Sequence, residues 1–172
     1  MKQKNCFSGV MRLFCLMALI YYDIPAHAQT NLWKECDFTV DGVYYDITSS
    51  TTVSVTYKGF ARDSYGYYPV SGFTGDVVIP SKVTYNSKEY DVTAIGAYAF
   101  KESAATSVTL PNSILTIADN AFYDSRQLTF VTLPGSLTTI GSSAFNGCIK
   151  LSSIVVPEGV TAMGNNCFAN CI

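Results

Sequence analysis

The sequence predicts a mainly β protein, a solenoid of 23-residue repeats with short parallel strands and short helical or 3-10 turns, preceded by an antiparallel β-hairpin cap. Three observations carry this prediction. Proline, phenylalanine and aliphatic residues recur with one period in the second half of the chain. Apolar and polar residues alternate just before each of these prolines, as in a half-buried strand. In the first half, an Asp-Gly pair lies between two short apolar segments and is typical of a β-hairpin.

Residues 1–28 have the features of a secretory signal peptide. Basic residues near the start precede an apolar segment over 13–22, and a small-x-small cleavage site ends at Ala28. About ten apolar residues are too few for a stable transmembrane helix, which needs roughly 20. Cys15 follows bulky residues rather than a small one, which favours release over lipid attachment. We therefore predict cleavage after Ala28, no transmembrane segment in the mature chain, and a secreted or cell-surface location.

Composition limits the class of protein. The chain has 172 residues, of which 48% are hydrophobic and 14% charged, enough to bury a core in one ordinary domain. Removing the signal peptide takes away the only histidine and moves the net charge from −2 to about −4. A mildly acidic chain is poorly suited to the phosphate backbone, so we predict no nucleic-acid partner.

Residues 29–76 are predicted to form the β-rich N-terminal cap. Two short apolar segments, 38–40 and 43–47, flank Asp41-Gly42, a strong signal for a two-residue hairpin turn. Residues 51–57 supply another strand, and residues 82–95 a second hairpin that turns near 86–88. A sheet here would cover the open edge of the first coil, which otherwise invites aggregation.

Residues 77–172 are predicted to form the solenoid, with about four repeats. The markers that keep the 23-residue spacing are Pro111, Pro134 and Pro157, then Phe122, Phe145 and Phe168, then Ile117, Ile140 and Met163. An irregular first copy begins at Val77 and ends at Phe100. The chain stops within a turn, before the next leucine, so we expect a C-terminally truncated array or an edge covered by a partner.

The repeat from Leu128 to Cys148 shows how one coil is expected to fold. Phe130 and Thr132 point outward from a short strand, and Pro134 ends that strand because it has no backbone donor. Gly141 turns the chain, and a brief helical or 3-10 turn begins at Ala144. The expected inward residues are Leu128, Val131, Leu133, Leu137, Ile140, Ala144 and Phe145.

The same stretch carries a family resemblance. Its pattern L-x-x-V-x-L-P-x-x-L-x-x-I-x-x-x-A-F-x-x-C resembles the BspA-type (Treponema-type) leucine-rich repeat of bacterial surface proteins, over residues 77–172. Residues 36–76 resemble the β-rich leader of such proteins, with weaker markers. The resemblance implies a curved, right-handed solenoid of the leucine-rich-repeat class, no catalysis, and adhesion or protein binding at the cell surface.

The mature cysteines raise the question of a disulfide or a metal site. They are Cys36, Cys148, Cys167 and Cys171. Cys148 and Cys171 are one repeat apart, so they would stack about 4.8 Å apart, but their parallel Cβ vectors disfavour a disulfide. We interpret Cys148 and Cys171 as small buried residues that stack at one repeat position, a ladder that also contains Ser103 and Ser125. Without a histidine or a second cysteine pair, no metal site is predicted.

No catalytic residue and no cofactor are predicted. A serine or cysteine nucleophile needs a nearby base, and histidine, the commonest base, is absent from the mature chain. The acidic residues are scattered over turns and the N-terminal cap, with no pair placed for general acid and base roles.

Three roles remain, and each predicts different binding. A protein-binding or adhesive solenoid would contact host matrix or another cell-surface protein through outward strand positions, namely Ser107, Thr109, Phe130, Thr132, Ser153 and Val155. A glycan-binding module would use the aromatic residues Tyr65, Tyr67, Tyr68 and Phe73. A structural spacer in a larger surface protein would bind neither.

Overall fold

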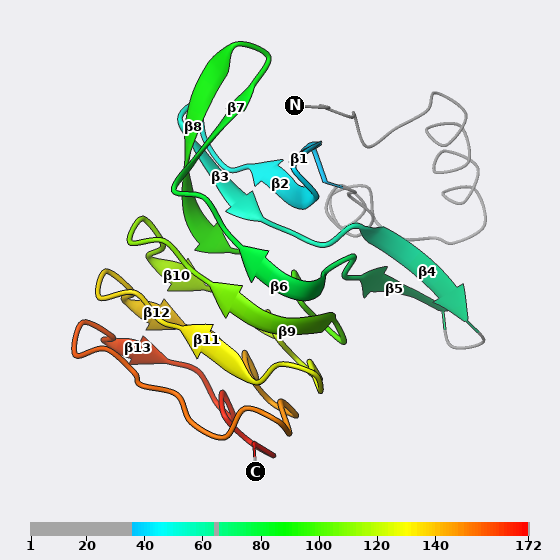
Figure 1. Cartoon of the computed structure of the whole chain (residues 1–172), viewed down its shortest axis with the longest axis vertical. Helices are drawn as coiled ribbons and strands as arrows, with labels where there is room; N and C mark the ends of the chain where they lie inside the picture. Colours follow the sequence, from blue (N-terminus) through cyan, green and yellow to red (C-terminus); the bar gives the residue numbers. More distant parts are fainter. Residues whose placement is uncertain (1–35, 64–65, 172) are drawn as a thin grey trace, which may run out of the picture.

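The computed structural model describes residues 36–63 and 66–171 (Figure 1). Thirteen strands are assigned in these ranges, and no helix is assigned within them. Most of them form an eight-stranded sheet and a three-stranded sheet. The strands β4 (Gly59–Asp63) and β5 (Gly66–Val70) form a separate antiparallel pair. The signal-peptide prediction falls outside the described residues.

The N-terminal strands form the hairpin that the Asp-Gly pair predicts. β1 (Phe38–Val40) pairs antiparallel with β2 (Val43–Ile47), with Val40 opposite Val43. Both turn residues, Asp41 and Gly42, have positive φ (49° and 82°), as a primed two-residue turn requires. β2 continues antiparallel to β3 (Thr52–Val55). The hairpin prediction is therefore confirmed.

This antiparallel part runs directly into a parallel sheet. β3 pairs in parallel with β8 (Lys88–Ile95), followed by β10 (Thr116–Ile117), β12 (Thr139–Ile140) and β13 (Ala162–Met163). Figure 1 shows these last strands stacked one below another. From β8 onward, each parallel strand lies 22 or 23 residues after its neighbour, so the predicted stacking of successive coils is confirmed.

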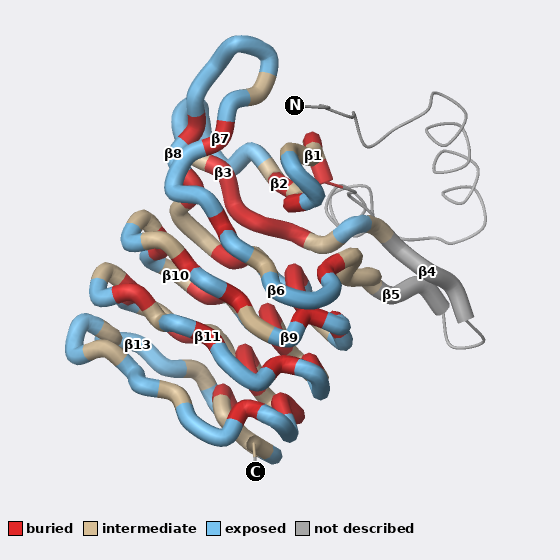
Figure 2. Tube along the Cα trace, in the orientation of Figure 1, coloured by how far each residue is buried: buried red, intermediate tan, exposed pale blue. Residues whose placement is uncertain are grey.

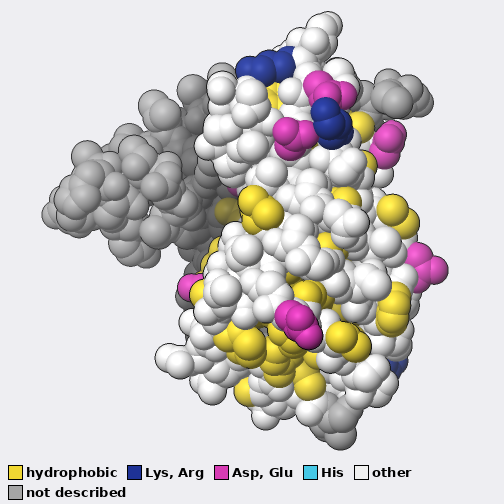
Figure 3. All heavy atoms as spheres, turned by 90° about the vertical axis from the view of Figure 1, so that its left-hand side faces the viewer, with side chains coloured by type: hydrophobic (Ala, Val, Ile, Leu, Met, Phe, Trp, Pro, Cys, Tyr) yellow, Lys and Arg dark blue, Asp and Glu magenta, His cyan; other side chains and the backbone are white. Residues whose placement is uncertain are grey.

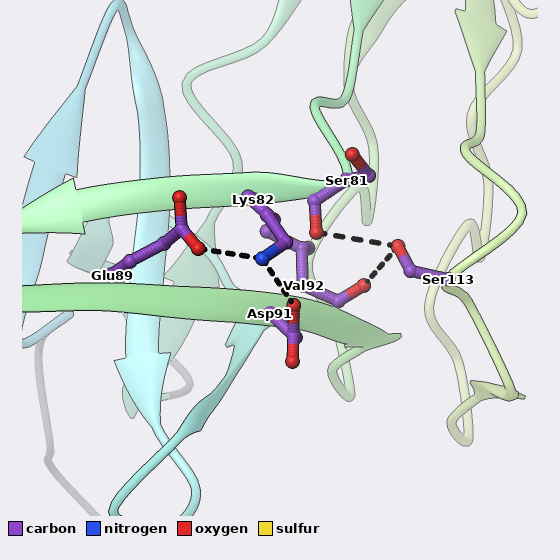
Figure 4. Close-up of polar contacts among 6 residues, drawn as sticks. All are labelled: Ser81, Lys82, Glu89, Asp91, Val92 and Ser113. Carbon is purple, nitrogen blue, oxygen red and sulfur yellow. Dashed lines mark hydrogen bonds and ion pairs between the residues drawn. The ribbon is translucent and has the colours of Figure 1, made fainter.

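The second predicted hairpin is also present. β7 (Lys82–Tyr85) pairs antiparallel with β8 and turns through Asn86 and Ser87. Lys82 Nζ lies 2.5 Å from Glu89 Oε1 and 3.7 Å from Asp91 Oδ1, which links the two strands (Figure 4). Ser113 Oγ donates to the carbonyl oxygen of Val92 (2.6 Å) and so ties this hairpin to the next coil. The cluster is exposed and has a structural role at the sheet edge.

The three-stranded sheet is parallel, and its β9 and β11 positions pair at the 23-residue spacing. It contains β6 (Thr74–Val78), β9 (Ala104–Thr109) and β11 (Phe130–Thr132). Four coils can be traced: 74–102 with β6 and β8, 103–125 with β9 and β10, 126–148 with β11 and β12, and 149–171 with β13. In the fourth coil, residues 152–156 are not assigned as a strand and do not pair with β11.

The core is built around a column of stacked phenylalanines. Ring centroids are 4.2 Å apart for Phe73 and Phe100, 4.7 Å for Phe100 and Phe122, 4.8 Å for Phe122 and Phe145, and 5.4 Å for Phe145 and Phe168. Buried stretches recur in each coil (Figure 2). The expected inward residues of the third coil are buried, apart from Leu133, which is half-buried. Repeated stacking of this kind holds one coil on the next.

The turns that were expected to be helical or 3-10 are not helical, which corrects the prediction. In the third coil, Ser143 and Gly147 have positive φ (53° and 78°), which interrupts a right-handed helix. The amide of Phe145 donates to the carbonyl of Cys167 in the next coil (2.8 Å) rather than back along its own turn. Left-handed residues and hydrogen bonds between coils therefore replace the helical turn.

The serine and cysteine ladder has the predicted position. Ser103 Oγ and Ser125 Oγ lie 3.3 Å apart, and Cys148 Sγ donates to the carbonyl of Phe122 (3.1 Å). Cys148, Cys167 and Cys171 are free thiols. Cys148 is buried and Cys171 half-buried, so the prediction of a small buried rung is confirmed for Cys148.

Candidate interaction surface

The outward side of the three-stranded sheet, with the matching positions of residues 152–156, forms a regular surface that we call the outer face. Period-two alternation turns Val108 and Val131 into the core and their neighbours outward. Two rows run across the strands. The first row contains Asp76, Ser107, Phe130 and Ser153, and the second contains Val78, Thr109, Thr132 and Val155.

The six residues predicted for protein binding all belong to this outer face. Register pairs Phe130 with Ser107 and Thr132 with Thr109, so the structure brings these four together. Ser153 and Val155 occupy the same repeat positions in the fourth coil and are exposed, but no ladder pairing fixes them against β11. Phe130 is 54% exposed and Val155 83%, which is unusual for large apolar side chains.

Sequence reasoning missed two residues of this surface. Val78 is 68% exposed and pairs with Thr109, and Asp76 pairs with Ser107. Aligning Pro80 with the later prolines would have found both, because each lies the same distance before its proline as the predicted residues do. The outer face therefore exposes three large apolar side chains, Val78, Phe130 and Val155.

Asp76 is held in place by two hydroxyls. Thr106 Oγ1 and Ser107 Oγ donate to the same oxygen, Asp76 Oδ1, at 2.8 and 2.7 Å. These hydrogen bonds, that from Ser107 first, lower the pKa of the Asp76 carboxyl below its usual value of 3.8. The carboxylate is therefore ionised at neutral pH.

The residues proposed for glycan binding do not form a comparable surface. Phe73 is 4% exposed, stacks on Phe100 and lies edge-on to Tyr44 with centroids 5.4 Å apart. It is the first rung of the phenylalanine column, so its expected place among exposed aromatic residues is wrong. Tyr65 lies outside the described residues, and Tyr67 and Tyr68 are described only as backbone of β5.

Burial raises the pKa of the Cys148 thiol to about 12, so this thiol is protonated and a poor nucleophile. Within 36–63 and 66–171, no three His, Cys, Asp or Glu side chains gather closely enough to hold a metal ion. The same residues contain no helix that is long and apolar enough to cross a membrane.

Other apolar side chains are exposed outside the outer face. Hydrophobic side chains gather on the lower half of the molecule when it is seen from the left-hand side of Figure 1 (Figure 3). Met163 is 54% exposed, whereas its equivalents Ile117 and Ile140 are fully buried beneath a following coil. The exposure of Met163 therefore reflects its place in the last described coil.

Three solved structures with the same fold show what the chain resembles. A leucine-rich repeat protein from Bacteroides ovatus is 30% identical with a TM-score of 0.66, over 78% of this chain and 33% of its own. One from Bacteroides capillosus is 32% identical with a TM-score of 0.61, over 73% of this chain and 85% of its own. A leucine-rich cell surface protein from Faecalibacterium prausnitzii is 25% identical with a TM-score of 0.57, over 77% and 40%.

The chain thus spans about a third of the length of the Bacteroides ovatus protein. A search of curated proteins finds no match. The family model described as the BspA type leucine-rich repeat region matches residues 77–172, more than half of the sequence. The chain therefore belongs to the BspA-type leucine-rich-repeat family of bacterial proteins.

Proposed function

We propose that the chain is a non-catalytic interaction module, secreted or displayed at the cell surface, that binds a protein ligand through its outer face. The observation that carries the proposal is the exposure of Val78 and Phe130 among small hydroxyl residues on one sheet, and of Val155 at the matching repeat position of the fourth coil. Exposed apolar side chains that lie together mark interaction surfaces, and aromatic residues such as Phe130 are enriched in protein interfaces. The ligand class is host matrix or another cell-surface protein.

The arrangement of the chain supports this role. We propose residues 1–28 as an export signal, 29–76 as the N-terminal cap and 77–172 as the binding solenoid. The repeated hydrogen bonds between coils, such as Thr129 N to Thr106 O (2.9 Å), keep the strands of the outer face in register. A preformed surface loses little conformational entropy on binding, which favours affinity.

Titration against immobilised host matrix proteins tests the proposal. Phe130→Ala should weaken binding by about 2 kcal/mol if the ring is a central anchor. Leu115→Ala is the matched control, because Leu115 is 47% exposed but lies outside the outer face. Circular dichroism should show both variants folded. Equal loss in the two variants, or no binding of the unmodified chain to any tested protein, would contradict the proposal.

Two other roles give different results in the same design. A glycan-binding module would bind a glycan array and lose this binding in a Tyr67→Ala, Tyr68→Ala double variant. Phe73, which was expected to contribute to such a site, is buried in the core. A spacer would bind in neither assay. The exposed apolar residues favour the protein ligand over both.

A further inference from the structure

The outer face carries a single charge. Among the outward positions of β6, β9 and β11 and residues 152–156, Asp76 is the one ionisable side chain, and the others are hydroxyl or apolar. No ion pair to Asp76 is present among the described residues. A carboxylate with no basic neighbour on its own face is free to meet a cation from outside.

A β-bulge fixes the position of this carboxylate. The register passes from Gly75 opposite Ala105 to Asp76 opposite Ser107, so Thr106 is the extra residue of β9. Consecutive strand residues normally face opposite sides, but the bulge lets both Thr106 and Ser107 donate to Asp76 Oδ1. No described residue donates to the other oxygen, Asp76 Oδ2. One oxygen is therefore held and the other is available.

The strand positions that carry the carboxylate and the exposed ring have a defined separation. Asp76, Ser107 and Phe130 are successive members of the first row, paired strand to strand. Two strand spacings place Asp76 roughly 10 Å from Phe130 along that row. The ring is 54% exposed, and only the small Ser107 lies between the two in the row.

We propose that the outer face binds a protein partner that presents a basic side chain and an apolar side chain roughly 10 Å apart, with Asp76 Oδ2 accepting the cation and Phe130 contacting the apolar group. This inference rests on the proposed function and specifies the chemistry of the partner. Charge complementarity selects a Lys- or Arg-bearing surface, since an acidic partner would meet the unpaired carboxylate. The net charge of −2 does not oppose a basic partner at longer range.

Selection from a random-peptide display library, with the full chain as bait, tests the inference. Enriched peptides should combine Lys or Arg with an aromatic or aliphatic residue. Their binding should weaken roughly tenfold in Asp76→Asn, because the variant loses a charge-assisted hydrogen bond. The amide oxygen of Asn can still accept from Thr106 and Ser107, so the bulge and the fold are retained. Added salt should weaken the unmodified chain more than the variant.

A second charge change is the matched control. Glu158→Gln removes one negative charge from an exposed turn outside the outer face and should leave peptide binding unchanged. If Phe130→Ala abolishes binding while Asp76→Asn does not, the outer face binds its partner but the inference about a basic group is wrong. If neither variant changes binding, both the inference and the proposed function are wrong. Failure to enrich any peptide, or binding only to neutral glycans, would also overturn the inference.

Discussion

Phe122 and Phe145 stack with their ring centroids 4.8 Å apart and their planes 7° apart, one ring from each of two successive coils. The centroid separation equals the usual spacing of neighbouring strands, so rings and backbones repeat together. Phe122 also stacks on Phe100, with centroids 4.7 Å apart and planes at 12°. A ring in the middle of the column therefore contacts an aromatic neighbour on each side.

Replacing a central ring should cost much of the stability. Phe122→Ala removes a fully buried side chain and both of its stacking contacts. The lost burial and the remaining cavity should lower the free energy of unfolding by about 3–5 kcal/mol, measured by equilibrium denaturation in urea.

Phe168→Ala is the control for this prediction. Phe168 is half-buried and stacks on Phe145 alone among the described residues. Its removal should cost clearly less than the loss of Phe122. Similar losses for the two variants would mean that the column does not carry the expected share of the stability.

Gly141 is required by the close approach of two coils. A Cβ at this position would lie 2.5 Å from the backbone nitrogen of Asp119 in the preceding coil. Gly141→Ala should therefore force the coils apart and lower the free energy of unfolding by about 1–3 kcal/mol in the same denaturation assay.

Gly135→Ala is the matched comparison. A Cβ on Gly135 meets nothing within 4 Å, and Gly135 is not among the residues with positive φ. This variant should be neutral or slightly stabilising, because alanine restricts the unfolded chain. A large loss at Gly135, or none at Gly141, would show that the contact between coils is not the reason for glycine.

The regular repeat was predictable because its markers depend only on spacing. Phe130 and Thr132 face outward as period-two alternation predicts, and Phe145 and Ile140 face inward. Phe73 was not recognised as part of the column because the β7–β8 hairpin lengthens the first coil. The interval from Phe73 to Phe100 is therefore longer than the later intervals, and the spacing rule fails there.

The arrangement around Asp76 was not predictable for a different reason. It depends on a one-residue register shift opposite Thr106, which is a property of strand pairing and has no local sequence signal. The left-handed turns were missed because Ala144 and Phe145 suit a helix, whereas the hydrogen bonds that decide the backbone come from the next coil. Both features arise from contacts between coils.

Ser143 offers a stabilising substitution. It has φ of 53°, and the same repeat position holds Asn120 (φ 56°) and Asn166 (φ 57°). Asparagine tolerates the left-handed region better than serine, so Ser143→Asn should raise the free energy of unfolding by about 0.5–1 kcal/mol. Ser143→Val should lower it, because a β-branched side chain is strained at positive φ. The melting temperature gives the order of the variants.

Ser142→Asn is the control, since Ser142 is not among the residues with positive φ. The same change there should give no stabilisation. If it stabilises as much as Ser143→Asn, the backbone conformation is not the cause.

Cys148 should make the fold sensitive to alkaline pH. Burial raises the pKa of its thiol from 9.0 to about 12, so above pH 9 the unfolded chain loses this proton while the folded chain keeps it. The contribution of this thiol to the free energy of unfolding is fully present below pH 9. Between pH 9 and 12 it falls by at most about 1.4 kcal/mol per pH unit. Burial also raises the pKa of Tyr57 to about 12, so Tyr57 adds to the same loss of stability at alkaline pH. The contribution of Cys148 is therefore the difference between the unmodified chain and a variant that lacks this thiol. Cys148→Ser places a small residue at a repeat position that serine already occupies in the preceding coil, as Ser125, and removes the titrating thiol. Denaturation curves across this range should therefore fall less steeply for Cys148→Ser, and parallel curves would show that Cys148 ionises equally in both states.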